Sequence, residues 1–396
     1  MRIGLFTNNY RPLVNGLAIS VETFARAFRR AGHDVVVVAP RYPGVPDSEE
    51  GVIRVPGVRA PTHHAYVLPL AFWPGIARAV AALQLDVFHA QHPLLLGRAA
   101  AKWARGALKP LVFTYHTHYD RYAHYVPGPS RLVARLAIRQ ATAYANRADL
   151  VVVPGPALIR VLRARGVQTR IAIAPTGVPP PTSPAEPHRR ACRQALGLEG
   201  NPLCLSAGRL AKEKNQALLL SAFVRIIQGL PNARLVLVGE GDDRSRLERL
   251  ARTLGIMSHV RFVGAVPHEA VGEYYRAADL FLFSSTSETQ GIVVLEALAT
   301  GLPVVAVLSD AAADLLGDGR GGILTFEEPE QFAKSVIGLW ESVERRQVMA
   351  EEGRQIAAQF APDACAARLL DLYAEVMQSF ETVPARATPK ITEART

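Results

Sequence analysis

The sequence predicts an α/β protein built from two doubly wound parallel sheets, and three observations lead to this expectation. Short apolar runs alternate with helical stretches along almost the whole chain, which is the pattern of parallel sheets covered by helices. A segment with five prolines, 179–187, interrupts the alternation near the middle, and the alternation then restarts. The chain has 396 residues, which suits two cores of ordinary size better than one.

The first half contains six candidate strands that are rich in Val and Ile and apolar on both faces, as in a buried parallel sheet. A helix is expected over 18–31, because Gly32 is a suitable residue to end it. We therefore predict a Rossmann-like domain over 1–178, followed by a stiff linker over 179–190, since proline lacks a backbone N–H and disrupts both helices and central strands. The strands are expected at 2–7, 34–39, 86–90, 111–115, 150–153 and 171–174.

The second half repeats the alternation and predicts a second Rossmann-like domain over 191–362. The two domains should face each other across a cleft, with ligands at the carboxyl ends of the strands. A helical stretch at 363–380 is expected to complete the first domain, and the tail 383–396 has no buriable face and is expected to be disordered. The strands are expected at 203–207, 234–238, 260–263, 280–283 and 303–307, and the helices at 214–228, 243–254, 268–277, 291–300 and 329–340.

Composition limits the classes of protein to consider. No apolar run is long enough to span a bilayer, the first residues lack a signal-peptide layout, and the three cysteines are widely spaced without a C-x-x-C pair. These features predict a reduced cytoplasmic protein without disulfides or a zinc site.

Residues 1–180 hold 22 of the 45 Lys and Arg but 8 of the 35 Asp and Glu. This asymmetry indicates an anionic partner. A membrane surface is one such partner. Nucleic acid is disfavoured because no nucleic-acid recognition motif is present. The alternative explanation for the excess of basic residues is a generally Arg-rich proteome.

Asn15 and Gly16 stand between the first strand and its helix. A glycine there lets the backbone approach a phosphate at a helix N-terminus, although an ordinary turn explains the pair equally well. The complete G-x-G-x-x-G pattern is absent, and at Gly239-Glu240-Gly241 only its first two glycines occur, which counts against a nicotinamide enzyme.

Arg209 and Lys214 follow the strand at 203–207. Two cations at the mouth of a cleft can neutralise a diphosphate while it is bound and as it leaves. The alternative is an ordinary ion pair between Arg209 and Glu213.

Glu288 and Glu296 stand eight residues apart, on either side of the expected start of a helix near Gly291. The amides of Gly291, Ile292 and Val293 would form an anion seat at that helix N-terminus. Glu296 could accept hydrogen bonds from vicinal ribose hydroxyls, and Glu288 from sugar hydroxyls. A charged Glu296 beside apolar neighbours would be costly to bury without such donors. The alternative is an amphipathic helix with one solvated carboxylate.

His116, His118 and Asp120 follow the strand at 111–115. Two histidines and a carboxylate can bind a metal, but a polar loop that contacts a sugar fits the pattern better. No D-x-D occurs anywhere in the chain, so the usual ligands for a metal bridge to a nucleotide diphosphate are missing. We therefore expect no metal and no cofactor.

Seven segments together resemble the retaining glycosyltransferases of family 4, which have the GT-B fold and an E-x7-E signature. The resemblance runs from residue 2 to about residue 375 of the sequence. The segments are NG at 15–16, YHTHY at 115–119, PTGV at 175–178, GRLAKEKN at 208–215, VLVGEGDDRSRLE at 236–248, FVGAVPHEAVGEYYRAADLFLFSS at 262–285 and SETQGIVVLEALATGLPVVA at 287–306.

The resemblance implies roles for the matching positions that would bind a nucleotide-sugar donor. Gly16 would approach the donor diphosphate through its backbone, and Arg209 and Lys214 would hold it. Val266 would contact the base through its main chain. Glu296 would bind the ribose hydroxyls.

The resemblance also implies which residues surround the transferred sugar. Those from Glu288 through Thr289 and Gln290 to Gly291 would line it, with Ile292 and Val293 completing the donor site, and His116 would contact it from the first domain. His116, Arg209, Lys214 and Glu288 would be the catalytic residues. The family retains anomeric configuration and generally needs no metal. Because the sequence shows no well-placed nucleophile, we expect a same-face reaction in which the leaving diphosphate helps to deprotonate the acceptor.

Two segments, ETQGIVVLEA at 288–297 and HTHYDRYAHYVP at 116–127, resemble the branch that glucosylates diacylglycerol in bacterial membranes. This likeness implies UDP-glucose as the donor, a membrane lipid as the acceptor, and peripheral binding to the inner face of the cell membrane. The stretch 130–147 has Arg131, Arg135 and Arg139 at four-residue spacing, beside Leu132, Val133 and Leu136. It could be an interfacial helix, or equally a core helix with a solvated basic side.

Other functions stay open at this point. The same chemistry could serve a soluble acceptor, or a GDP-mannose donor. An epimerase acting on nucleotide sugars would need acid and base carboxylates facing the sugar ring, which the two glutamates do not supply. A non-catalytic binding subunit would not need the complete set of Arg209, Lys214, Glu288 and Glu296. The sequence leaves the oligomeric state undetermined.

Overall fold

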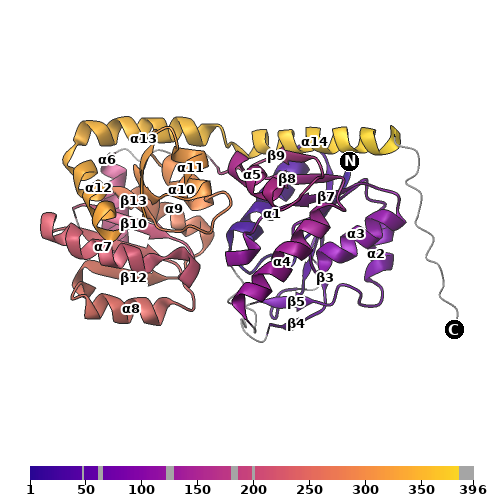
Figure 1. Ribbon diagram of the computed structural model, residues 1–396, viewed down its shortest axis with the longest axis horizontal. Helices are drawn as coiled ribbons and strands as arrows, with labels where there is room; N and C mark the ends of the chain where they lie inside the picture. The colour runs from indigo at the N-terminus through magenta and orange to yellow at the C-terminus, as the bar shows by residue number, and fades with distance from the viewer. Residues whose placement is uncertain (47–48, 61–65, 122–128, 180–185, 199–200, 383–396) are drawn as a thin grey trace.

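The computed structural model describes residues 1–46, 49–60, 66–121, 129–179, 186–198 and 201–382. The tail expected at 383–396 lies outside these ranges. The chain forms two α/β bodies side by side, with two long helices along one edge (Figure 1). The predicted architecture of two doubly wound parallel sheets is confirmed.

The first sheet is parallel throughout and has the order β3-β2-β1-β6-β7-β8-β9. β1 lies between β2 and β6, so that Ile3 pairs with Val35 on one side and Val87 on the other. All six strands predicted for this half are present. The seven strands are β1 Arg2–Phe6, β2 Asp34–Pro40, β3 Val52–Val55, β6 Val87–Ala90, β7 Leu111–Thr114, β8 Leu150–Val153 and β9 Ile171–Ile173, and a separate antiparallel pair comprises β4 Gly57–Arg59 and β5 Val67–Pro69.

Helices cover both faces of this sheet, which explains why its strands are apolar at successive positions. Phe113 faces one core and its neighbour Val112 faces the other, because successive side chains of a strand point to opposite faces. The last helix, α14, packs on α1 and places the fully buried Tyr373 in the second of these cores. These helices are α1 Gly16–Arg30, α2 Ile76–Ala82, α3 Leu96–Gly106, α4 Ser130–Ala145, α5 Pro156–Ala164 and α14 Pro362–Thr382.

The second sheet is also parallel and has the order β12-β11-β10-β13-β14-β15. Its five predicted strands are present, whereas β15 was not expected because it begins with Gly322 and is only partly buried. Phe281 and Leu282 again point into different cores. The strands are β10 Leu203–Ala207, β11 Arg234–Val238, β12 Val260–Gly264, β13 Leu280–Phe283, β14 Val304–Val307 and β15 Gly322–Thr325.

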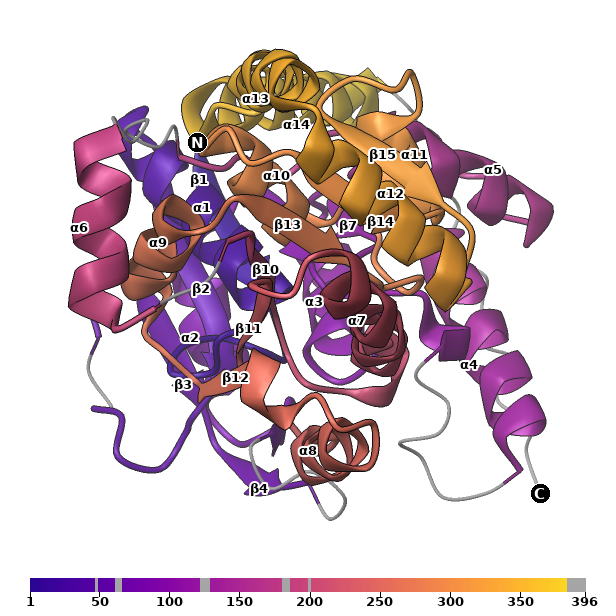
Figure 2. The same ribbon diagram turned by 90° about the vertical axis from the view of Figure 1, so that its left-hand side faces the viewer.

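The helices of the second domain lie in two layers about this sheet (Figure 2), with α6, α9 and α10 on one face and α7, α8 and α12 on the other. The helix predicted from residue 214 begins at Gln216, because Asn215 takes a left-handed backbone conformation after a 3-10 turn over Lys212–Lys214. The helices are α6 Glu186–Leu196, α7 Gln216–Gly229, α8 Arg244–Thr253, α9 His268–Ala277, α10 Ile292–Ala299, α11 Asp310–Leu316, α12 Pro329–Glu341 and α13 Val343–Ala358, with a 3-10 turn at Met257–His259.

The prediction that 179–190 is entirely linker is wrong, because α6 begins within it, at Glu186. Pro187 is the second residue of that helix, and proline is tolerated in the first turn, where its missing N–H would have no partner in any case.

The chain passes between the domains twice, and the two passages lie side by side. The backbone N–H of Val178, on the outward passage, donates to the carbonyl of Phe360, on the return, at 2.9 Å. A Cβ on Gly177 would lie 2.4 Å from the Cα of Pro362, so only glycine permits this close crossing. The domains are therefore connected by two backbone segments that are in direct contact with each other.

Candidate active site between the two sheets

Loops from the carboxyl ends of the two sheets meet between the domains. After β13, the hydroxyl of Thr289 donates to the carbonyl of His116, which follows β7, at 2.9 Å. The side-chain amide of Gln290 accepts from the N–H of Thr176 at 2.9 Å and donates to its carbonyl at 2.7 Å. The structure thus brings together segments that the sequence singled out separately, and Gln290 links the domains.

The N-termini of α1 and α10 point into the same region. Asn15 begins α1, with its side chain accepting from the N–H of Ala18 at 2.9 Å, and Gly291 begins α10 with a φ of 72°. A Cβ on Gly16 would lie 3.7 Å from Ile292. Neither helix has an acidic residue in its first turn. Two helix N-termini, each carrying a partial positive charge, therefore lie close together across the domain boundary.

Close packing of two loops fixes the segment that carries Arg209. A Cβ on Gly239 would lie 1.9 Å from the carbonyl oxygen of Gly208, and one on Gly241 would lie 2.2 Å from that of Leu210. The glycine pair in Gly239-Glu240-Gly241 is explained by this backbone contact, so the incomplete dinucleotide pattern has a structural reason here.

The predicted cations are both present at the site and both are in ion pairs. Arg209 pairs with Glu213, the partner that the sequence offered as the alternative, and Lys214 pairs with Glu288. The hydroxyl of Ser284 donates to the carbonyl of Lys214 at 2.8 Å, which ties the loop after β13 to this turn. The structure therefore brings Lys214 to Glu288 and holds Arg209 with Glu213 in a second ion pair of the same segment.

Glu296 is nearly enclosed, and its side chain is only 15% exposed. The hydroxyl of Tyr275, on α9, donates to its carboxylate at 2.8 Å, and His268 Nε2 lies 3.7 Å away. Burial raises the pKa of the Glu296 carboxyl, while His268 and Tyr275 act in the opposite direction. Tyr275 and His268 were not identified as site residues from the sequence, because only the packing of α9 on α10 brings them to Glu296.

His116 is held by Gln91, with 2.6 Å between its Nε2 and the amide oxygen. Burial, followed by the neighbouring His92 and His89, lowers the pKa of His116 well below its ordinary value, so the ring is neutral at pH 7. Asp120 points elsewhere and pairs with Arg165 at 2.9 Å. Within the described ranges, no group of three or more His, Cys, Asp or Glu side chains could hold a metal ion.

The remaining predicted positions lie at the edge of the site. Val266 follows β12 just before α9 and packs on the core shared by α9 and α10. Val293, in the first turn of α10, offers its carbonyl to the hydroxyl of Tyr275 at 3.3 Å.

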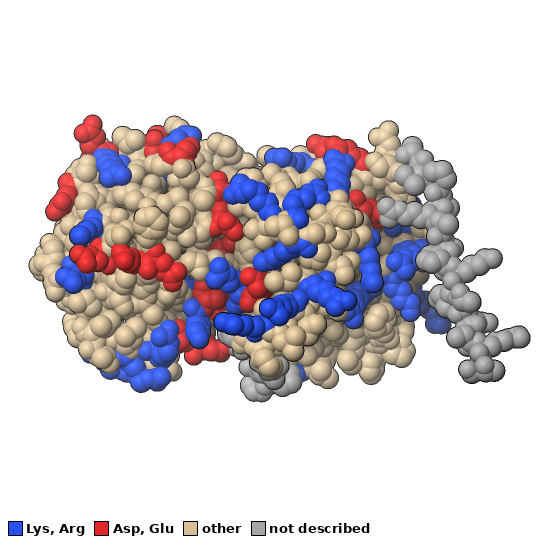
Figure 3. Space-filling model, in the orientation of Figure 1, with Lys and Arg blue, Asp and Glu red and all other residues tan. Residues whose placement is uncertain are grey.

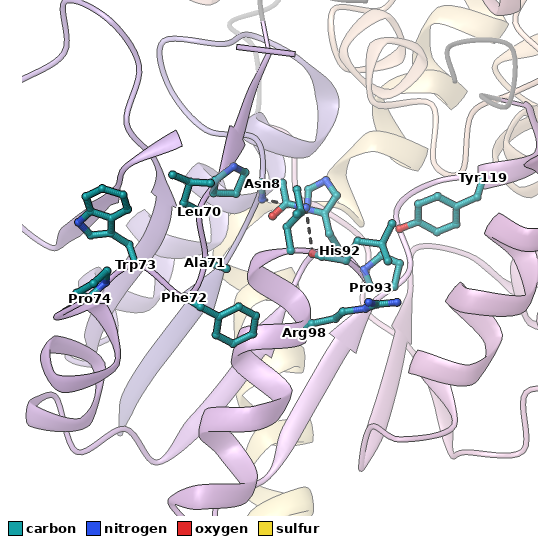
Figure 4. Close-up of a pocket in the computed structure, with 13 residues that line it drawn as sticks. Asn8, Leu70, Ala71, Phe72, Trp73, Pro74, His92, Pro93, Arg98 and Tyr119 are labelled. Atoms are coloured by element: carbon teal, nitrogen blue, oxygen red, sulfur yellow. Dashed lines mark hydrogen bonds between the residues drawn. The ribbon is translucent and has the colours of Figure 1, made fainter. Parts of the chain in front are cut away.

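A cavity of about 790 Å³ opens in the first domain and was not expected from the sequence. Its walls come from loops after β1, β5, β6 and β7, so no single sequence segment indicates it (Figure 4). Most of its lining is apolar, and it is made by Asn8, Pro69, Leu70, Ala71, Phe72, Trp73, Pro74, His92, Pro93, Leu94, Leu95, Arg98 and Tyr119.

Comparison with known families assigns both halves of the chain. Residues 14–180 match the family described as Glycosyltransferase Family 4, and residues 188–356 match the one described as Glycosyl transferases group 1. Relatives cover nearly the whole chain. The alpha-monoglucosyldiacylglycerol synthase of Acholeplasma laidlawii is 28% identical over 95% of this chain and 98% of its own. The protein of the same description from Streptococcus pneumoniae is 31% identical over 83% of this chain and 76% of its own.

Another relative carries a donor in its name. A GDP-mannose-dependent alpha-mannosyltransferase of Mycobacterium tuberculosis is 31% identical over 82% of this chain and 83% of its own. Among the relatives compared, the same level of identity thus accompanies glucosyl and mannosyl transfer.

Solved structures share the fold at lower identity. A sucrose-phosphate synthase from Thermosynechococcus elongatus matches with a TM-score of 0.81 and 22% identity, over 96% of this chain and 99% of its own. Anabaena HepE, solved with UDP and glucose, matches with a TM-score of 0.76 and 21% identity, over 94% of this chain and 99% of its own. The chain belongs to family 4 of the glycosyltransferases, and it is a hexosyltransferase with the GT-B fold.

Proposed function

We propose that this enzyme transfers glucose from UDP-glucose to a membrane lipid acceptor such as diacylglycerol, with retention of anomeric configuration and without a metal ion. The observation that carries the proposal is the meeting of two helix N-termini at Gly16 and Ile292, next to the loop in which Glu288 pairs with Lys214. A diphosphate bridges such positive groups, and their field stabilises the charge that develops as it leaves.

Glu296 supports the binding of a ribose in the same site. Its carboxylate keeps acceptor capacity after the bond from Tyr275, because an ionised carboxylate has about four acceptor sites. Vicinal ribose hydroxyls are suitable donors for a buried carboxylate, and they would offset the cost of its desolvation. Gly16 and the first turn of α10 would then face the diphosphate, with Val266 toward the base.

The residues around the sugar support a same-face reaction. Glu288 is paired with Lys214, which makes its carboxylate a weaker nucleophile, and the Nε2 of His116 is engaged by the side-chain oxygen of Gln91, so we assign neither as a nucleophile. In the proposed step, the bond from the anomeric carbon to the diphosphate oxygen breaks, and the acceptor oxygen bonds to the same face of that carbon. The acceptor proton passes to the departing phosphate oxygen, and Arg209 and Lys214 stabilise the charge left on the diphosphate.

The surface of the first domain supports an acceptor held at a membrane. Lys and Arg side chains gather over α4 and its surroundings (Figure 3). On α4, Leu132 and Leu136 are 53% and 50% exposed beside the exposed Arg131, Arg135 and Arg139. A simple core helix would bury those leucines, so the interfacial interpretation is favoured. No helix in the described part of the chain is long and apolar enough to cross a bilayer, and the binding proposed is peripheral, at the inner face of the cell membrane.

A second donor, GDP-mannose, follows from the mannosyltransferase relative. The diphosphate and ribose groups would bind as proposed for UDP-glucose, so the choice rests on contacts to the base and to the sugar. The experiment supplies UDP-glucose or GDP-mannose with dioleoylglycerol in anionic vesicles, and identifies products and their anomeric configuration by mass spectrometry and NMR. An α-glucosyl diacylglycerol is expected. A product formed only on added soluble sugars would contradict the lipid acceptor, and a product formed only from GDP-mannose would contradict the donor.

A further inference from the structure

The apolar cavity of the first domain begins next to the proposed catalytic region. His92 lines it, and the preceding residue, Gln91, holds His116 at 2.6 Å. Asn8 lines it from the loop after β1, bonding His92 Nδ1 through its N–H and the carbonyl of Leu94 through its side chain, both at 3.2 Å. The cavity thus starts at the carboxyl ends of the strands, where acceptor and donor must meet, and its volume is typical of small-molecule sites.

The outer part of the cavity is apolar and open to solvent. Phe72 and Trp73 are 63% and 49% exposed, and Leu94 is 43% exposed. Large exposed apolar side chains gathered at one opening indicate a binding surface and not ordinary surface scatter. A hydrophilic acceptor would need polar groups along these walls, and Figure 4 shows aromatic and aliphatic side chains there.

Basic side chains connect the rim of this cavity to the proposed membrane face. Lys102 lies over the ring of Phe72, with its Nζ 5.4 Å from the ring centre. Arg98 donates to the side-chain oxygen of Gln140, on α4, at 2.8 Å. The wall of the cavity at Arg98 therefore contacts α4, the helix that carries the exposed arginines, and these charges would hold this side of the domain against an anionic bilayer.

Tyr119 adds a polar group inside the cavity. Its hydroxyl is buried and has no hydrogen-bond partner among the described residues, and Figure 4 shows it directed into the pocket, opposite Leu70 and Trp73. An unsatisfied buried hydroxyl costs free energy, and a ligand oxygen in the cavity would satisfy it. A ligand with one polar end near Tyr119 and an apolar remainder fits both features.

We propose that this cavity binds the acyl chains of a diacylglycerol acceptor, with the Tyr119 hydroxyl donating a hydrogen bond to an oxygen of its glycerol ester. This inference rests on the proposed function, since it names the site that the lipid acceptor would occupy. Tyr119 is then a positioning residue, and the acyl chains lie along Phe72, Trp73 and Leu94.

The first test measures binding without turnover. Short-chain diacylglycerols are titrated below their aggregation concentrations, and the tryptophan fluorescence of Trp73 reports occupancy, with the Trp73→Phe variant as the blank. Dioctanoylglycerol has four more methylenes than dihexanoylglycerol, and each contributes about fourfold when buried. It should therefore bind at least about tenfold more tightly even when only two of them enter the cavity, and glycerol should give no change. Leu94→Asp should abolish the signal, whereas Leu108→Asp, at an exposed leucine away from the cavity, should leave it intact. Equal response to glycerol, or an unchanged titration in Leu94→Asp, would overturn the proposal.

The second test concerns Tyr119. Tyr119→Phe should raise the KM for dioctanoylglycerol about fivefold to tenfold, as expected for one lost hydrogen bond, with kcat at saturation and UDP-glucose affinity unchanged. Tyr42→Phe removes a buried hydroxyl outside the cavity and should change none of these values. A KM for Tyr119→Phe equal to that of the wild type would remove Tyr119 from the site.

The two proposals fail in different ways. If fluorescence shows chain-length-dependent binding but no glycolipid forms with any donor, the proposed activity is wrong and the lipid site stands. If glycolipid forms but the cavity variants bind and react as the wild type does, the acceptor site is wrong and the activity stands.

Discussion

The two domains have the same construction but present different surfaces. Each has a parallel sheet with an apolar core on both faces. In the second domain the functional candidates are charged groups held in pairs, such as Lys214 with Glu288, or nearly enclosed, as Glu296 is. In the first domain they are exposed arginines beside exposed leucines and aromatic rings. The same construction thus carries a polar site in one domain, where we propose that an anionic donor binds, and an amphipathic surface in the other.

The largest expected effect separates the surface of the first domain from the site of the second. Replacing Arg131, Arg135 and Arg139 together by Gln should weaken binding to anionic vesicles by about 3 kcal/mol, or roughly a hundredfold, because each basic residue near such a surface contributes about 1 kcal/mol. Co-sedimentation measures this change, and UDP affinity should stay constant. Wild-type binding should disappear at high salt, since the attraction decays within about 8 Å at physiological ionic strength.

A matched control removes three exposed arginines from the other domain. Arg246, Arg249 and Arg252 lie on α8, and their replacement by Gln changes the net charge equally. Vesicle binding should then change little. If both triple variants lose binding to the same degree, total charge and not the α4 surface is responsible.

Loss of Arg209 should affect both donor binding and stability. Arg209→Ala removes a charge-assisted bond to the diphosphate, worth about 1.5–3 kcal/mol, and leaves the buried Glu213 carboxylate without this partner. Calorimetric titration with UDP and thermal unfolding measure the two effects. Adding Glu213→Gln should recover stability without recovering UDP affinity. Recovery of both would show that Arg209 acts only through Glu213.

Glu296→Ala tests the proposed ribose contact and leaves the ion pairs of Arg209 and Lys214 in place. We expect UDP affinity to fall by about 1.5–3 kcal/mol, with the fold retained, as circular dichroism can verify. Glu296→Gln keeps one acceptor oxygen for Tyr275 and should lose less. Wild-type UDP affinity in Glu296→Ala would exclude this residue from the donor site.

The pH dependence of donor binding should reflect the same carboxyl. Since burial raises its pKa, the folded state favours the protonated form, and this contribution to stability is lost as pH rises through the raised pKa. Donor binding has the opposite dependence, because ribose hydroxyls need the carboxylate. UDP-glucose affinity should therefore decline on acidification, and this decline should begin at a higher pH than an ordinary glutamate would cause. In Glu296→Gln this loss of affinity on acidification should be absent, and its persistence would assign it to another group.

Removal of metal ions is expected to have no effect on activity. Activity should survive EDTA, because Arg209 and Lys214 can supply the positive charge that a metal provides in other enzymes. Initial rates with and without chelator measure this. Complete loss, with recovery on adding Mg²⁺ or Mn²⁺, would replace these cations by a metal in the mechanism.

The parts of the fold that the sequence predicts are those encoded locally. Strands such as Leu150–Val153 and Arg234–Val238 agree with prediction within one residue, because continuous apolar runs flanked by polar residues have few alternatives. The start of α6 at Glu186 differs from prediction because the prolines before it disfavour a helix, although the first turn of a helix tolerates proline.

The candidate site was predictable only in part, because some of its residues are brought together by packing and not by a local sequence pattern. Loop residues such as Glu288 carry a recognisable spacing, whereas Tyr275 reaches Glu296 through helix packing that no local pattern encodes. The cavity is harder still to predict, since Asn8, Phe72, His92 and Tyr119 come together only when four loops are placed by the sheet.

The return of the chain to the first domain has a consequence for the order of synthesis. Tyr373 of α14 is fully buried against α1 and forms a 2.5 Å hydrogen bond with His89, on β6. The segment Pro362–Thr382 leaves the ribosome after the entire second domain. Domains usually fold as units in the order in which they emerge, but here the first domain to be translated has an incomplete core until the second has been made. The domain proposed to bind the donor can therefore complete its core first, and the domain proposed to meet the membrane completes its core last.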